Sequence, residues 1–168
     1  MEPGAFIPPP GFSRETTIHR DADGRWTQDG IPLEHANLVR AFDRWVDRAE
    51  DGRLCLKNDL GWAYITLDGA PLFVRSVLLD GAGATLRLSD DREERLDPHT
   101  LRIGPDGALY CDARAGLLPA RFDRHAQAQL ADALEEDARG VHITIGGVRV
   151  TPRSVADPLA PVRPAPRM

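Results

Sequence analysis

The stretch Ile18–Trp26, IHRDADGRW, is the part of this 168-residue sequence that sets the expected architecture. Short strand-like ends flank the turn-forming pair Asp23-Gly24, which is typical of a β-hairpin. A similar stretch, IGPDGAL, begins at Ile103, and its turn is made by Asp106-Gly107. The sequence therefore predicts a comparable hairpin in each half of the chain.

Each hairpin is followed by apolar residues at helical spacing. The first set consists of Leu38, Phe42, Trp45 and Ala49. The second set consists of Leu118, Phe122, Ala126, Leu130 and Leu134. Residues repeating at this period on one face predict amphipathic helices with their apolar side in the core. Pro32 and Leu118-Pro119 are expected to open the helices, and Gly52 and Gly140 to close them.

The two halves therefore share one order of elements: hairpin, helix opened by proline, glycine stop and strand. The segments AFDR, residues 41–44, and RFDR, residues 121–124, also match. We expect an α+β fold in which antiparallel sheets each pack on a helix, built from a duplicated hairpin–helix–strand unit. Coincidence between two ordinary units remains the alternative. The clearest single element is the hairpin Val141–Val150, with Gly146-Gly147 as its two-residue turn.

Proline-rich ends frame the predicted folded part. We expect a flexible N-terminal arm over residues 1–15, a first unit over 16–96, a second unit over 97–151 and a disordered tail over 152–168. Residues 1–11 have no positive segment followed by an apolar one, so they do not resemble a signal peptide.

Composition narrows the function classes. The net charge of −5 argues against bulk binding to nucleic acid or anionic membranes. No apolar run approaches the length of a membrane span, so no membrane association is expected. The two cysteines, Cys55 and Cys111, lie in apolar runs and form no disulfide framework, which favours a reducing, cytoplasmic location.

Several runs resemble the bacterial family called domain of unknown function 1285. The N-terminal ones are Ile18–Arg20, Asp23–Trp26, Gly30–Pro32, Leu38–Phe42 and Asp51–Leu54. The later ones are Ile65–Asp68, Ala70–Phe73 and Arg114–Leu117. The resemblance implies a duplicated α+β fold whose second half is loosely similar to pleckstrin-homology-like domains. It also implies a nucleotide-like ligand between the halves and a role in signal transduction, with no established enzymatic activity. Residues 58–62 and Ser89-Asp90 depart from the family pattern.

No catalytic or metal motif is present in the sequence. Asp21-x-Asp23-Gly24 begins like a calcium loop but lacks the later ligands of an EF-hand. The histidines are scattered, and His142 is expected on the solvent face of its hairpin. No serine stands in a G-x-S-x-G context. We therefore predict no catalytic residue, no metal and no cofactor.

The candidate ligand-binding residues combine arginines with an aromatic side chain. They are Asn58, Trp62, Arg75, Arg87, Arg114 and Arg121. Arginines would hold a phosphate and Trp62 would stack on a base, although packing in the core is the more common place for such a tryptophan. Arg114 and Arg121 flank the predicted start of the second helix, where anions are favoured. Two alternatives remain open: a protein-interaction module without a small ligand, and a hydrolase whose residues meet only in space.

Overall fold

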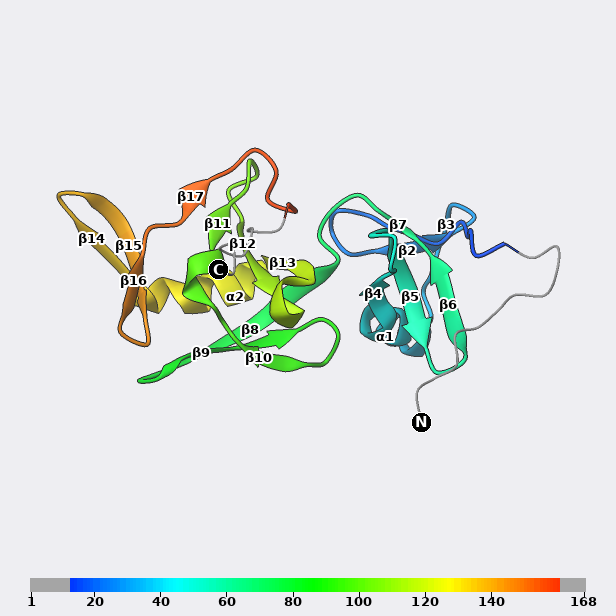
Figure 1. Cartoon of the computed structure of the whole chain (residues 1–168), viewed down its shortest axis with the longest axis horizontal. Coiled ribbons are helices and arrows are strands. Elements are labelled where there is room, and N and C mark those ends of the chain that lie inside the picture. The colour runs from blue at the N-terminus through cyan, green and yellow to red at the C-terminus, as the bar shows by residue number, and fades with distance from the viewer. Residues whose placement is uncertain (1–12, 161–168) are drawn as a thin grey trace. The chain divides into compact units, whose positions relative to one another are not determined.

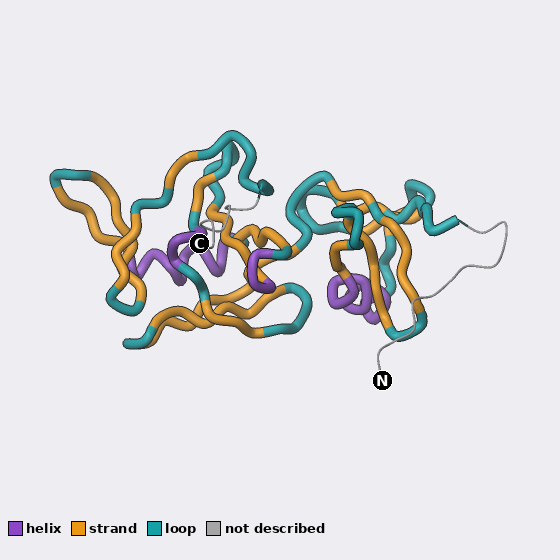
Figure 2. Tube along the Cα trace, viewed as in Figure 1, coloured by secondary structure: helices purple, strands orange, loops and turns teal. Residues whose placement is uncertain are grey.

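The computed structural model describes residues 13–160. Most of its regular secondary structure is β-strand, and it has two α-helices (Figure 2). The chain divides into two compact units, Met1–Pro71 and Leu72–Met168, which are described separately. Within the described residues, no helix is both long enough and apolar enough to cross a bilayer. The predicted α+β class is confirmed.

The first unit contains two small sheets and one helix, α1 (Ala36–Trp45). One sheet has the order β3-β2-β1-β7, and the other has the order β4-β5-β6. The strands of the first sheet are β1 (His19–Arg20), β2 (Trp26–Gln28), β3 (Ile31–Pro32) and β7 (Thr66–Leu67). Those of the second are β4 (Val46–Arg48), β5 (Leu54–Asn58) and β6 (Gly61–Tyr64). Their shared core consists of Trp26, Phe42, Val46, Leu56 and Ile65.

The first predicted helix is shorter than expected at both ends. Pro32 lies in β3, and α1 starts at Ala36, with the His35 ring accepting the N–H of Leu38. After Trp45 the chain becomes β4, because Val46 is fully buried opposite Leu56 of β5. A β-branched residue with a strand partner outweighs the helical period here.

The second unit is built on a seven-stranded sheet with the order β10-β9-β8-β13-β12-β11-β17 (Figure 1). Its long strands are β8 (Leu72–Asp80), β9 (Gly83–Leu88), β12 (Leu109–Ala113) and β13 (Leu118–Phe122). Its short strands are β10 (Glu93–Arg95), β11 (Arg102–Ile103) and β17 (Arg153–Ser154). The pairs β8–β13 and β11–β17 are parallel, and the others are antiparallel. Because β8 pairs with β13, residues 72–96 belong to this unit, and the predicted boundary after residue 96 is wrong.

A helix and a small sheet complete the second unit. Helix α2 (Arg124–Leu130) contacts β8 and continues into a 3₁₀ turn, η3 (Ala131–Ala133). The three-stranded sheet has the order β14-β15-β16. Its strands are β14 (Leu134–Asp137), β15 (Gly140–Ile145) and β16 (Val148–Val150). The predicted Gly-Gly hairpin is confirmed, with both glycines of the turn at positive φ.

The predicted second helix is wrong at both ends, and its last part, Leu134–Asp137, is strand β14. Leu118–Phe122 is strand β13, and α2 begins only after Asp123, whose carboxylate accepts the N–H of Ala126. The matching Phe-Asp pairs therefore occupy different places, inside α1 in one unit and at a strand–helix junction in the other. The duplication stays a prediction.

The predicted tail is partly ordered. Strand β17 pairs with β11, the N–H of Val155 donates to Ile103, and the guanidinium of Arg102 donates to the carbonyl of Pro158 at 2.8 Å. Hydrogen bonds to a distant strand hold this proline-rich segment in place. The rest of the predicted tail, residues 161–168, and residues 1–12 of the predicted arm lie outside the described part of the chain.

Candidate functional site

A cavity of about 470 Å³ lies in the first unit beside the β5–β6 hairpin. Polar and aromatic side chains dominate its lining: Arg14, Arg48, Lys57, Asn58, Trp62 and Tyr64. Two of these, Asn58 and Trp62, are predicted site residues. The cavity also includes Glu50 and Asp51, so three cationic and two acidic side chains surround it.

The strand register explains why these residues meet. In the β5–β6 hairpin, Lys57 is opposite Trp62, and Cys55 is opposite Tyr64. Side chains alternate along a strand, so these four lie on one face and line the cavity. The alternating residue Leu56 faces the other way and enters the core. A strand with one polar and one apolar face thus supplies both the site and its support.

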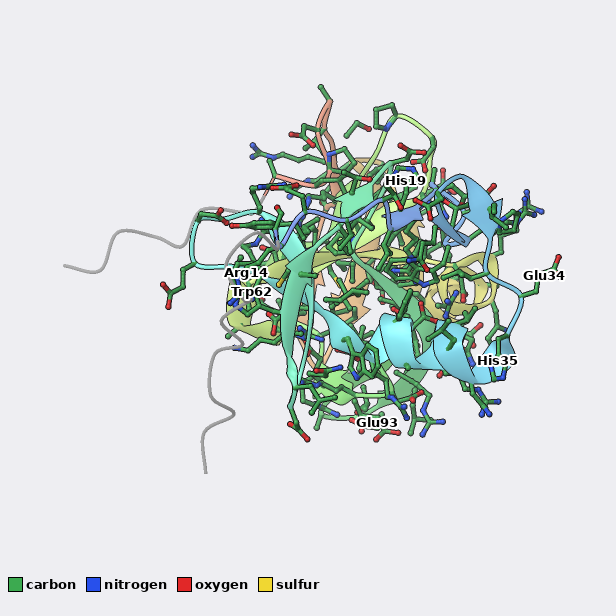
Figure 3. All side chains as sticks on the ribbon, turned by 90° about the vertical axis from the view of Figure 1, so that its right-hand side faces the viewer. Arg14, His19, Glu34, His35, Trp62 and Glu93 are labelled. Atoms are coloured by element: carbon green, nitrogen blue, oxygen red, sulfur yellow. The ribbon has the colours of Figure 1, made fainter. Side chains whose placement is uncertain are left out.

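Trp62 is half-buried and has one occupied face. The guanidinium carbon of Arg14 lies 3.8 Å from its ring centroid, and Arg14 donates a hydrogen bond to the carbonyl of Trp62 at 2.8 Å. The ring of Tyr64 meets Trp62 edge-on, with 4.9 Å between centroids. Figure 3 shows Arg14 beside Trp62. The indole is therefore held by cation–π and edge contacts on the cavity wall and does not belong to the core cluster.

The N-terminal segment forms one side of the site. The main chain of Arg14 accepts the N–H of Tyr64 at 2.8 Å, and the hydroxyl of Thr16 donates to the Tyr64 carbonyl at 2.6 Å. The carboxylate of Glu15 forms two hydrogen bonds with Arg53, at 2.6 and 2.9 Å. Residues 13–15, predicted as part of a flexible arm, are thus fixed along β6.

One of the two acidic side chains of the cavity, Asp51, is held by hydrogen bonds. The Tyr64 hydroxyl donates to Asp51 at 2.5 Å, and the N–H of Arg53 donates to the same carboxylate at 3.0 Å. These two hydrogen bonds hold the pKa of Asp51 below its ordinary value.

Asn58 has a local role, because its side-chain oxygen accepts the N–H groups of Leu60 and Gly61 and closes the turn.

The thiol in the cavity wall is held in its protonated form by burial. Cys55 is buried, and that burial raises its pKa to about 11. The thiolate, the reactive form, is therefore scarce at neutral pH. Residues 13–160 also contain no cluster of three or more side chains suited to a metal ion.

The four predicted arginines lie in the second unit, apart from this cavity. Arg114 is 8% exposed and pairs with the fully buried Asp90 at 2.7 Å, while its main-chain N–H donates to Glu94. No α-helix begins at this position: Arg114–Gly116 is a 3₁₀ turn, and strand β13 follows it. The predicted helix N-terminus between Arg114 and Arg121 is therefore wrong.

The other three arginines are more exposed and ion-paired. Arg75 approaches Asp123 at 3.8 Å, and Arg87 approaches Glu93 at 3.4 Å. Arg121 binds Asp106 at 3.0 Å. Each pair joins neighbouring elements of the second unit. None of the four is among the residues that line the 470 Å³ cavity.

Two histidines are each linked to a hydroxyl and a carboxylate, an arrangement relevant to the hydrolase alternative. His19 lies 2.6 Å from the Thr66 hydroxyl and 3.0 Å from Asp68. His142 lies 2.7 Å from the Thr151 hydroxyl and 3.1 Å from Asp137. His142 is buried, so its predicted solvent exposure is wrong.

Neither histidine, nor its hydroxyl partner, lines the 470 Å³ cavity of the first unit or a second cavity of about 230 Å³ in the second unit. A substrate bound in either cavity would therefore not meet these groups.

Sequence reasoning did not identify Arg14, Lys57 and Tyr64 as site residues. Arg14 lies in the stretch assigned to a flexible arm, and no local pattern indicates that it crosses β6. Lys57 and Tyr64 could have been found, because the turn at Asn58–Gly61 sets the hairpin register and places both on the face of Trp62.

Comparisons with known proteins support the fold. No family model and no curated protein matches the chain. A crystal structure of a DUF1285 family protein from Silicibacter pomeroyi DSS-3 matches with a TM-score of 0.64 and 23% identity, over 80% of this chain and 78% of that one. A DUF1285 family structure from Shewanella baltica OS155 matches with a TM-score of 0.56 and 16% identity, over 71% of this chain and 94% of that one. The α+β fold expected from the sequence resemblance is therefore confirmed, and this chain is similar in fold to these DUF1285 family structures. The duplication and the pleckstrin-homology-like second half stay predictions.

Proposed function

We propose that this chain is a regulatory protein that binds a small, nucleotide-like molecule in the cavity of its first unit. The observation that supports this most is the convergence of Trp62, Tyr64, Arg14 and Lys57 on one polar cavity. Aromatic rings stack on bases whatever the base, and cations neutralise a phosphate.

The charge of the lining limits the class of ligand. The carboxylates of Glu50 and Asp51 would repel a highly charged polyphosphate, so the site favours a ligand with one anionic group. Asp51 remains ionised at neutral pH because its pKa is lowered, and it can accept hydrogen bonds from a ribose or an exocyclic amine. A nucleoside monophosphate or a cyclic nucleotide fits these requirements.

Catalysis does not enter the proposal. The cavity thiol of Cys55 has a raised pKa, and neither histidine of the first unit, His19 or His35, lines the cavity. The two residues that define the ligand class, Trp62 and Lys57, act by stacking and by charge.

A melting screen tests the proposal. All three tryptophans, Trp26, Trp45 and Trp62, belong to the first unit, so tryptophan fluorescence on heating reports this unit. A ligand at 100 times its Kd stabilises the folded state by about 2.7 kcal/mol. We expect a saturable rise in melting temperature with a nucleoside monophosphate or a cyclic nucleotide.

A matched pair of variants locates the binding site. Lys57→Ala removes a cavity cation and should weaken the binding at least fivefold. Arg40→Ala removes an exposed cation of α1 in the same unit and should leave the affinity unchanged. Equal loss in both variants, or no shift with any nucleotide, would overturn the proposal.

A further inference from the structure

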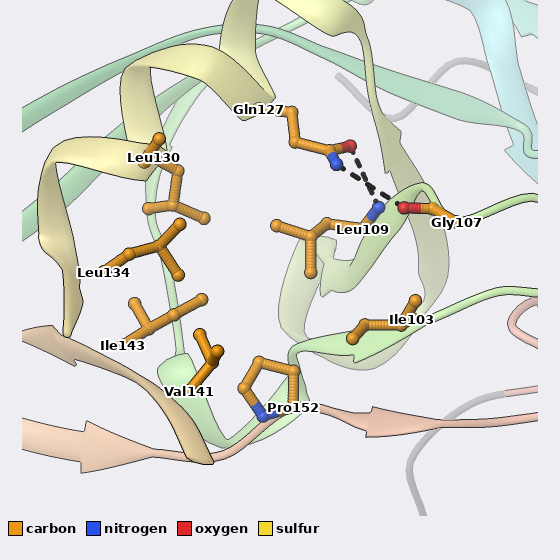
Figure 4. A pocket seen from close by; sticks show the side chains of 10 residues that line it. Ile103, Gly107, Leu109, Gln127, Leu130, Leu134, Val141, Ile143 and Pro152 are labelled. Atoms are coloured by element: carbon orange, nitrogen blue, oxygen red, sulfur yellow. Dashed lines mark hydrogen bonds between the residues drawn. The ribbon is translucent and has the colours of Figure 1, made fainter. Parts of the chain in front are cut away.

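The second unit contains a separate apolar cavity of about 230 Å³ (Figure 4). Its wall is formed by hydrocarbon side chains from α2, β12, β14 and β15: Leu109, Leu130, Leu134, Val141 and Ile143. The amide group of Gln127 also reaches it but is already engaged, since it accepts the N–H of Leu109 at 3.2 Å and donates to the carbonyl of Gly107 at 3.4 Å. The cavity is therefore suited to an uncharged, apolar group.

The cavity is open along one side of the β14–β15 hairpin. Leu134 and Val141 are 46% and 49% exposed although both line it. The register pairs Leu134 with Ile143 and Glu136 with Val141, so these four side chains lie on one face. Two large apolar side chains thus remain half in water at the mouth, where an apolar occupant would cover them.

Strand β14 is an edge strand beside this mouth. It is the end strand in the order β14-β15-β16, and all four of its residues are exposed. An edge strand offers outward N–H and C=O groups to another extended segment. Peptides commonly bind by adding a strand to such an edge, with alternate side chains filling neighbouring pockets.

The charge of β14 indicates the chemistry of its partner. Three of its four residues are acidic: Glu135, Glu136 and Asp137. Asp137 is already engaged by Arg149 and His142, and Glu135 accepts from Thr144. The Glu136 side chain makes no hydrogen bond or ion pair within residues 13–160. It lies on the same face of the hairpin as Leu134 and Val141, the residues at the cavity mouth.

From these features we infer that β14 binds an extended basic peptide of a partner protein. The peptide adds as a fourth strand of the small sheet. One aliphatic side chain enters the cavity past Leu134, and an arginine or lysine two residues away meets Glu136. This site is independent of the nucleotide site, because all its residues belong to the second unit.

The probe is the peptide acetyl-Arg-Arg-Leu-Arg-Arg-amide, which places arginines symmetrically around one leucine and fits either strand direction. Titration into ¹⁵N-labelled full chain should shift the amide signals of residues 134–143. Replacing the leucine of the peptide by glycine keeps the charge and should weaken binding at least tenfold. Methylating the leucine nitrogen and one neighbouring nitrogen keeps the side chains and should also weaken it, since strand pairing needs those donors.

Protein variants give the matched control. Leu134→Lys places a cation at the mouth and should weaken binding at least tenfold. Leu78→Lys makes the same change at an exposed position of β8 that does not line the cavity, and should have no more than a twofold effect.

Three results would overturn the inference. Equal binding of the leucine and glycine peptides would show attraction by charge alone. Binding of benzene at residues 134–143 without any peptide binding would make the cavity a small-molecule site. Concentration-dependent shifts of the β14 signals without peptide would identify a second copy of the chain as the occupant.

Discussion

Removal of the Arg114 side chain should destabilise the second unit and leave nucleotide binding intact. Its guanidinium donates to the Asp90 carboxylate at 2.7 and 3.1 Å, and the Asp90 side chain is 0% exposed. In Arg114→Ala this carboxylate would stay buried without its main cation. Removing one partner of a buried ion pair typically costs about 3–5 kcal/mol.

The structure places the expected loss at the lower end, about 3 kcal/mol. Asp90 keeps one hydrogen bond, since its other oxygen accepts the N–H of Arg92 at 3.0 Å. The control is Arg87→Ala, which breaks an exposed pair with Glu93 at 3.4 Å and should cost at most about 0.5 kcal/mol.

The assay must report the second unit, which contains no tryptophan. Hydrogen exchange followed by mass spectrometry does so, by comparing the amides of β9 and β12 in the two variants. A loss of 3 kcal/mol corresponds to roughly 100-fold faster exchange where exchange needs unfolding of the unit. Equal, small effects of Arg114→Ala and Arg87→Ala would refute the argument that the Asp90 pair is desolvated.

Three further predictions concern single residues. Burial raises the pKa of Glu94, so the folded state holds its proton more tightly than the unfolded state. Ionisation then costs stability above the folded pKa, a cost that disappears as the pH falls. In urea titrations, the free energy of unfolding of Glu94→Gln relative to that of the parent protein should therefore be higher at pH 7 than at pH 4. The same difference at both pH values would contradict this. Cys55, with a pKa of about 11, should react with a disulfide reagent at pH 8 only after unfolding; rapid labelling of the folded chain would be the opposite result. A Cβ on Gly146 would lie 2.5 Å from the Ala82 carbonyl oxygen, whereas one on Gly147 would meet nothing within 4 Å. Both have positive φ, so Gly146→Ala should cost at least about 1 kcal/mol more than Gly147→Ala, and equal costs would contradict the clash.

Local signals predicted some elements well. The hairpin over 141–150 follows from strand-forming residues around Gly146-Gly147, and the structure has it in that register. Leu72–Asp80 is a strand, as its apolar run predicts. The turns and the hydrophobic periodicity of these elements can be recognised within about ten residues of sequence.

The errors arise where distant partners decide the outcome. Leu118–Phe122 fits a helical stripe through Leu118 and Phe122, and Pro119 argues against a central strand. The segment is nonetheless strand β13, placed between β8 and β12, with Pro119 opposite Asp112. The two-residue period of a strand was also present in the sequence, because Leu118, Ala120 and Phe122 are apolar and stand two positions apart. The structure buries all three.

The candidate site shows the same division. Trp62 and Asn58 were predicted and line one cavity, whereas the arginines predicted with them lie in the other unit. Residue type alone favoured these arginines as phosphate ligands, although all four form ion pairs within the second unit. Arg14 could not have been identified, since its contact with Trp62 spans 48 positions of sequence.

An NMR titration of the ¹⁵N-labelled chain with adenosine 5′-monophosphate tests the central claim most directly. The indole N–H of each of the three tryptophans gives its own signal. We predict that the Trp62 signal and the amides of residues 57–64 shift in a saturable manner, while the buried indole of Trp26 stays unchanged. Unchanged signals for residues 57–64 at millimolar nucleotide, or shifts confined to the second unit, would contradict the proposed site.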